Sequence, residues 1–222
     1  MKRILVISAL FIAAAGCGGN DKKEEKTATS DSAVTKTETT APAAENKTEA
    51  PEPKMDSASM MKAWQAYMTP GKEHAMMAKS NGNWKEELTM WMAEGAPAEK
   101  HTSTCTNKMI MNGLYQQSVH KGNMNGMPFE GVSTMGYDNA KKKYVSTWID
   151  NMGSGIMYTE GTYDSTNKML TMTGNVMDPL TGKPMDVRQT MTFIDDKTEM
   201  MEMYETKGGK ERKTLEIKFT KM

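Results

Sequence analysis

Cysteine is almost absent from the 222 residues, which contain only Cys17 and Cys105. If Cys17 is used as an attachment point, no internal disulfide can form. Neither charge is in excess, because 28 basic residues balance 28 acidic ones, and this excludes the overall basic character typical of nucleic-acid-binding proteins. Hydrophobic residues make up only 37% of the chain, so we expect part of it not to fold.

The motifs of the common enzyme classes are also missing. The sequence has no Gly-x-Ser-x-Gly, no phosphate-binding loop and no dinucleotide fingerprint. The three histidines do not have the spacing of a two-histidine metal motif on a helix. Most carboxylates lie beside lysines in expected turns. We therefore expect a protein without enzymatic activity and without a cofactor.

The first 17 residues, MKRILVISALFIAAAGC, have the pattern of a targeting segment. Lys2 and Arg3 precede an apolar run that is too short to span a bilayer, and small residues lead into Cys17. We predict a signal peptide over 1–16. Its ending resembles a bacterial lipobox, which implies that Cys17 carries acyl chains and attaches the protein to a membrane. The alternative is a secreted protein in which Cys17 has no such role.

Residues 17–54 contain the expected lipidated Cys17 and then one valine as their only large apolar side chain. A segment of this composition buries too little surface to offset the entropy of ordering, so we predict a disordered tether. The charged cluster at 21–25 resembles sorting signals that send some bacterial lipoproteins outward. We expect a lipid-anchored protein of the bacterial cell envelope, on the outer membrane.

Residues 55–82 have helical periodicity and are predicted to form a helical lid. Asp56 or Ser57 is suited to cap a helix over SASMMKAWQAYM. Thr69 and Pro70 favour the start of a second helix, with Thr69 as its N-cap, and Asn81-Gly82 is a natural stop.

Residues 83–222 change to period-two alternation, with a turn signal every ten to fourteen residues. Short connections favour antiparallel pairing of neighbours, and a meander of about ten strands most simply closes into a barrel. An open sandwich is the alternative. The expected strands are 84–93, 99–111, 114–121, 127–137, 143–150, 156–163, 168–177, 185–194, 198–206 and 210–221.

The Gly82-Asn83-Trp84 segment stands where the helical region feeds the first expected strand. Lipocalins and fatty-acid-binding proteins have a similar Gly-x-Trp at this place. The resemblance implies that Trp84 packs across one end of the barrel beneath a basic side chain from a late strand. Lys221 shares the face of the last strand's apolar residues and is the expected partner, with Arg212 as the second choice.

Longer segments resemble one bacterial family, known as domain of unknown function 1579. They are TPGKEHAMMAKSNGNWK (69–85), NKMIMNGLY (107–115), GMPFEGVSTMGYDNAKKKYVSTWIDNMGSGIMYTEGTYD (126–164) and GGKERKTLEIKFTK (208–221). The resemblance covers about 60–222. It implies a calycin-like barrel in the cell envelope and implies no particular chemistry.

A barrel interior is the default ligand site. Trp148 and Asp150 share a face of one expected strand, although they also suit a core aromatic and a turn cap. Arg188 is the only arginine between positions 4 and 211, and an inward Arg188 would suit a carboxylate ligand. Its alternative is a solvent-facing Arg188 paired with a neighbouring strand. The favoured function is non-catalytic binding of a small apolar or amphipathic molecule.

Methionine is abundant, with 25 residues. Thioethers favour Cu(I), so a copper-handling protein is one alternative function. Methionines at alternate strand positions also simply fill a core, and we favour that interpretation. A structural or protein-interaction module with a filled core is the other alternative. The sequence does not indicate an oligomeric state.

Asn112-Gly113 is the strongest hairpin signal, because it favours a type I′ turn. A two-residue turn there places Cys105 opposite His120, with His101 on the same face. A nearby imidazolium would lower the pKa of the thiol, and two or three such side chains would be able to hold a metal weakly. A small buried cysteine beside a rim histidine is the simpler interpretation.

Overall fold

A computed structural model describes residues 55–222. The predicted signal peptide, Cys17 and the predicted tether lie outside these residues. Within 55–222, neither helix is long and apolar enough to cross a bilayer.

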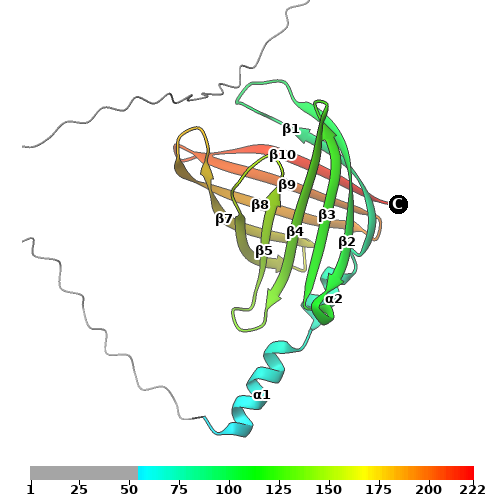
Figure 1. Cartoon of the computed structure of the whole chain (residues 1–222), viewed down its shortest axis with the longest axis vertical. Coiled ribbons are helices and arrows are strands. Elements are labelled where there is room, and N and C mark those ends of the chain that lie inside the picture. Colours follow the sequence, from blue (N-terminus) through cyan, green and yellow to red (C-terminus); the bar gives the residue numbers. More distant parts are fainter. Residues whose placement is uncertain (1–54) are drawn as a thin grey trace, which may run out of the picture. The chain divides into compact units, whose positions relative to one another are not determined.

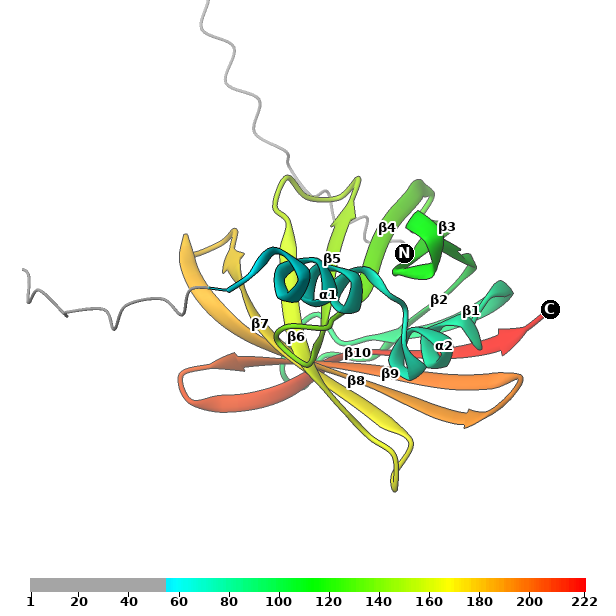
Figure 2. The ribbon, with the colours of Figure 1, turned by 90° about the horizontal axis from the view of Figure 1, so that it is seen from below.

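Two helices precede the sheet. Helix α1 (Ser57–Met68) begins at Asp56, whose carboxylate accepts the Ser59 amide at 2.9 Å. Helix α2 (Lys72–Ala78) begins at Gly71 rather than at Thr69, which instead ends α1. The predicted cap is therefore misplaced, because the Thr69 hydroxyl donates backward to the Gln65 carbonyl at 2.6 Å. Helix α1 buries none of its residues, whereas α2 packs onto the barrel (Figure 2).

Ten antiparallel strands close into a barrel in which each strand pairs with its neighbours in sequence and β1 pairs with β10 (Figure 1). This confirms the predicted strand number and closure, and it excludes the open sandwich. The strands are β1 (Gly82–Met90), β2 (Glu99–Ile110), β3 (Tyr115–Met124), β4 (Met127–Asp138), β5 (Lys143–Asp150), β6 (Met157–Asp164), β7 (Met169–Asp178), β8 (Lys183–Asp195), β9 (Thr198–Lys207) and β10 (Lys210–Lys221).

The turn between β2 and β3 fixes their register as predicted. The Leu114 amide donates to the Met111 carbonyl at 3.2 Å across a single turn, η1 (Met111–Gly113). Asn112 and Gly113 both have positive φ, 56° and 83°, as a type I′ turn requires. The ladder runs from Ile110–Tyr115 and includes the pair Cys105–His120.

The end of the barrel beside α2 is closed. Trp84 is 1% exposed and lies inside this end. Side chains from five strands hydrogen-bond to residues 77–80: Trp84 and Asn107 to the Ser80 carbonyl, Gln116 to the Met77 carbonyl, Lys221 to the Lys79 carbonyl, and Glu199 as acceptor of the Ser80 hydroxyl. The turns β1–β2, β3–β4, β5–β6 and β7–β8 lie at the opposite end, because the meander is antiparallel.

Strands β6 and β7 approach each other unusually closely at two glycines. A Cβ added at Gly161 would lie 1.8 Å from the Thr171 carbonyl oxygen, and one at Gly174 would lie 2.1 Å from the Tyr158 carbonyl oxygen. Backbone atoms cannot give way as a flexible side chain can. Only glycine is therefore compatible with this seam of the barrel.

Candidate functional site

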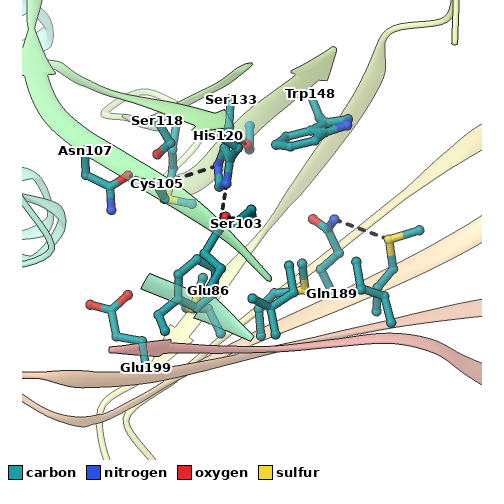
Figure 3. A pocket seen from close by; sticks show the side chains of 18 of the residues that line it. Glu86, Ser103, Cys105, Asn107, Ser118, His120, Ser133, Trp148, Gln189 and Glu199 are labelled. Atoms are coloured by element: carbon teal, nitrogen blue, oxygen red, sulfur yellow. Dashed lines mark hydrogen bonds and ion pairs between the residues drawn. The ribbon is translucent and has the colours of Figure 1, made fainter. Parts of the chain in front are cut away.

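The barrel encloses a cavity of about 470 Å³. Its lining comes from α2 and from the inward-facing residues of the strands, which alternate with outward-facing ones. The interior is thus not filled by side chains, in contrast to the alternative of a filled core. Figure 3 shows part of the lining from close by.

The wall formed by β2–β5 is rich in polar side chains. Figure 3 shows Ser118, Ser133 and His120 on this side of the cavity. The polar residues of this wall that line the cavity are Ser103, Asn107, Gln116, Ser118, His120, Ser133, Ser146 and Asp150. The hydroxyls of Ser133 and Ser146 lie 3.3 Å apart, so neighbouring strands interact here through polar groups.

The wall formed by β7–β10 is mostly apolar. Gln189 and Glu199 are its two polar lining residues, and Figure 3 shows them facing the polar wall. The apolar lining residues are Met172, Val176, Met191, Phe193, Met201, Met203, Leu215, Ile217 and Phe219. Met201 and Met203 share the inner face, as predicted for methionines at alternate positions. Methionine here supplies flexible apolar lining in place of leucine.

Two buried groups, Glu86 and Cys105, form a chain in the cavity wall with the half-buried His120 between them. Oε1 of Glu86 lies 2.7 Å from Nδ1 of His120, and Nε2 of His120 lies 3.7 Å from Sγ of Cys105. The Ser103 hydroxyl donates to the other oxygen of Glu86. Because a carboxylate accepts hydrogen bonds, this contact favours a proton on Nδ1 and leaves Nε2 facing the thiol.

The order thiol, imidazole, carboxylate is also that of a nucleophilic triad. Here, however, the pKa of Cys105 lies well above its ordinary value, mainly because the thiol is buried and further because Glu86 and Glu199 are negatively charged nearby. A lowered thiol pKa is therefore wrong, and the interpretation of a small buried cysteine beside a histidine agrees with the structure. The predicted pairing was right, but burial and the two carboxylates outweigh the imidazole.

Glu199 is a second buried carboxylate, from β9, and it faces the base of α2. Its Oε1 accepts the Ser80 hydroxyl at 2.5 Å. Burial raises the pKa of Glu199, while the Ser80 hydrogen bond and the positive charge of Lys221 oppose that rise. The Glu199 carboxyl group therefore takes up a proton at a higher pH than an exposed glutamate does.

Trp148 and Asp150 both line the cavity, as their shared face predicts. The Trp148 indole donates to Asp150 at 2.7 Å, and the other Asp150 oxygen accepts the Met152 amide at 2.9 Å. Asp150 is thus also the turn cap considered from the sequence. The Trp148 ring meets the His120 ring edge to face, with centroids 5.0 Å apart.

Arg188 does not face the cavity, so the ligand-binding role considered for it is wrong and the alternative of an outward Arg188 paired with another strand is right. Its guanidinium makes two hydrogen bonds to Glu211, at 2.8 and 2.7 Å, and lies 4.0 Å from the Tyr204 ring centroid. Val187 and Gln189, its neighbours in β8, have the inward positions. The guanidinium of Arg188 therefore lies on the outer face of the barrel, away from the cavity.

The remaining predicted residues lie at other places along the barrel. Lys221 Nζ lies 5.1 Å from the Trp84 ring centroid, the arrangement expected for barrel closure. Arg212 instead donates to the Trp91 carbonyl at 3.0 Å. His101 lies 3.5 Å from Glu99 and is not part of the group formed by Cys105 and His120.

Glu86 and Glu199 were missed by sequence reasoning. A usable signal existed for Glu86, because it alternates with Trp84 and Leu88 and must share their inward face. The same alternation places Glu199 with Met201. An acidic residue in a half-exposed strand is ordinarily assigned to the solvent side, and here the period-two pattern outweighs that tendency.

The family described as "Protein of unknown function (DUF1579)" matches residues 69–221. Among solved structures, the chain is similar to Rv2717c from M. tuberculosis, with a TM-score of 0.51 and 9% sequence identity. The alignment covers 69% of this chain and 99% of that one. At this identity the likeness concerns the fold alone. A search of curated proteins found no match.

Proposed function

The chain belongs to the DUF1579 family, whose function is unknown, and we propose that it is an envelope lipoprotein that binds a small amphipathic molecule inside the barrel without transforming it. The observation that carries this proposal is the cavity itself. Its volume, about 470 Å³, lies within the range of roughly 300–1,000 Å³ typical of small-molecule sites.

The two walls indicate the chemistry of the ligand. The apolar side chains of β7–β10 suit a hydrocarbon portion, and the hydroxyls, amides and imidazole of β2–β5 suit a polar group. A hydrocarbon placed against the polar wall would cover its hydroxyls and amides without offering them hydrogen bonds, which is costly. A ligand with donors or acceptors on one side only is therefore favoured over a pure hydrocarbon.

Apolar side chains at the turns opposite α2 support the same class of ligand. Met92, Met152, Ile156 and Leu180 are all exposed there, in the β1–β2, β5–β6 and β7–β8 connections. Met152 also lines the cavity, so the apolar surface continues from the turns into the interior. Met152 is thus an apolar side chain that a ligand can contact both at this end of the barrel and inside the cavity.

Binding is tested with a dansyl-labelled fatty acid as the probe. Wild-type protein is expected to increase its fluorescence saturably. Ser146→Phe places a ring in the cavity and should lower the affinity at least tenfold, because Ser146 faces inward. Thr147→Phe is the matched control, since Thr147 is the next residue on β5 and is exposed.

Two results would contradict the proposal. One is the absence of probe binding to folded wild-type protein. The other is equal affinity of Ser146→Phe and Thr147→Phe, which would place the probe on the outer surface. Arg188→Ala should leave the affinity unchanged, because the guanidinium pairs with Glu211 outside the barrel.

The envelope location rests on the sequence around Cys17 and is tested separately. Cys17→Ser should yield an unacylated precursor that retains residues 1–16. Wild-type protein should partition into the detergent phase and show the mass of attached acyl chains, because acyl chains hold a protein at a membrane. Recovery of unmodified wild-type protein in the aqueous phase would refute the lipid anchor.

A further inference from the structure

The chain of Glu86, His120 and Cys105 has a use beyond amphipathic ligand binding. We propose that Cys105 and His120 bind a divalent transition-metal ion of the Zn²⁺ class in the cavity wall, with Glu86 orienting the imidazole. One ligand atom from each of the three residues lies within 4.8 Å of the other two. The residues come from three adjacent strands, β1, β2 and β3, which fix their positions.

The separation of the two ligand atoms fits a single ion. Sγ of Cys105 and Nε2 of His120 lie 3.7 Å apart. With a metal–sulfur distance of about 2.3 Å, a metal–nitrogen distance of about 2.0 Å and tetrahedral angles, sulfur and nitrogen lie about 3.5 Å apart. A small side-chain adjustment is thus sufficient, and the ordered strands need not move.

Glu86 prepares the imidazole for this role. It is 1% exposed and holds Nδ1 of His120 at 2.7 Å, so Nε2 is the nitrogen available to a metal. The Ser103 hydroxyl in turn fixes the carboxylate. A carboxylate behind a metal-ligating histidine is the usual outer-shell arrangement, and it sets the orientation and raises the basicity of the ring.

The charges of the site favour a cation. Glu86 and Glu199 are two buried carboxylates in the surroundings of Cys105. Metal binding would replace the thiol proton, and the resulting thiolate together with Glu86 would balance the two positive charges of the ion. A thiolate and an imidazole are ligands that suit Zn²⁺ and Co²⁺.

The coordination is open on the cavity side. Glu86, Cys105 and His120 all line the cavity, so further positions on the ion are reachable from it. Oδ1 of Asn107, which accepts the Cys105 thiol at 3.0 Å, is an oxygen atom suited to serve as a further ligand. Water, or the polar group of a bound molecule, would complete the shell, as in zinc sites that keep a free position.

The test uses chelator-treated, reduced protein titrated with Co²⁺ as the spectroscopic probe. Wild-type protein should develop a thiolate-to-cobalt charge-transfer band in the near ultraviolet and bind Zn²⁺ in competition. Cys105→Ser should abolish the band, and His120→Gln should weaken binding strongly. Glu86→Gln should keep the band but lower the affinity about 10–100-fold, because it acts through His120.

His101→Gln is the matched control. His101 lies on the same strand as Cys105 but beside Glu99, so this variant should titrate like wild type. Circular dichroism verifies that each variant is folded. If Cys105→Ser does not fold, the wild-type band and the comparison of His120→Gln with His101→Gln decide the question.

Three results would overturn the metal site. They are the absence of a charge-transfer band in folded wild-type protein, undiminished binding by folded Cys105→Ser, and equal losses in His101→Gln and His120→Gln. Probe binding by the fatty acid is measured in the presence of chelator. Failure of the metal site therefore leaves the proposed function standing, and failure of probe uptake leaves the metal titration valid.

Discussion

The two walls of the cavity differ in what their side chains contribute. On β2–β5, nine of the 13 lining residues have nitrogen or oxygen atoms in their side chains, against two of 11 on β7–β10. The apolar wall packs against itself and against Leu88 and Trp84 of β1. The polar wall hydrogen-bonds across its own strands and toward α2.

This difference suggests separate roles for the two walls, one in folding stability and the other in ligand recognition. Burial of apolar area is the main favourable term in folding, so the wall of β7–β10 is expected to supply most of the folding free energy. Hydrogen bonds contribute little net stability, but they are specific in direction. The wall of β2–β5 is therefore the one expected to select a ligand.

The strongest test of this division is Phe219→Ala on the apolar wall. Phe219 is buried in the cluster that contains Trp84 and Ile217. Its loss should lower the free energy of unfolding by about 3–5 kcal/mol, measured by urea denaturation. Leu180→Ala is the control, because Leu180 is 88% exposed, and it should change stability by less than about 0.5 kcal/mol. Equal effects would contradict the division.

Gly161→Ala tests the close contact between β6 and β7, which lies between the polar wall and the apolar wall. The added methyl would meet the Thr171 carbonyl, so the backbones of β6 and β7 must separate. We expect a loss of about 1–3 kcal/mol in unfolding free energy. Gly155→Ala is the matched control, because nothing lies within 4 Å of its added Cβ. A neutral Gly161→Ala would show that the close approach is not required.

Glu199→Gln sharpens the comparison by removing the one carboxyl group of the apolar wall. Burial raises the pKa of Glu199 in the folded state, so the folded state binds more protons than the unfolded state. Wild-type stability is therefore lost as pH rises from the ordinary glutamate pKa through the raised one. The variant should resemble wild type at pH 4 and gain stability relative to it at pH 7. A constant difference between these pH values, measured by denaturant unfolding, would contradict the shift.

Ser133→Ala tests the polar wall and should have only a small effect on stability. It removes one weak contact, to the Ser146 hydroxyl, so a change below about 1.5 kcal/mol is expected in unfolding free energy. The affinity for the fatty-acid probe should change more clearly than stability does. A large loss of stability with unchanged probe affinity would reverse the roles assigned to the two walls.

The sequence predicted the barrel well because its signals are local. Turn residues such as Asn112-Gly113 determine both where a strand ends and which residues face each other across the hairpin. The pairing of Cys105 with His120 followed from that turn alone. Period-two alternation also placed Trp148 and Asp150 on one face.

Other features depend on more than local pattern. The rarity of arginine did not indicate which way Arg188 faces, and the inward positions of β8 belong to Val187, Gln189 and Met191. The hollow interior could not be foreseen either. Whether methionines fill a barrel depends on its radius, which is set by strand number and stagger together.

The pairing of β1 with β10 has a consequence for how the protein folds. Every other ladder joins strands that are neighbours in sequence, whereas Trp84 pairs with Lys221, 137 positions further along the chain. Hairpins form early because their loops are short, and a contact between distant segments bears the largest closure entropy. Closure of β1 on β10 is therefore expected to come last. No single hairpin contains the cavity, so uptake of a ligand would report the completion of folding in time-resolved experiments.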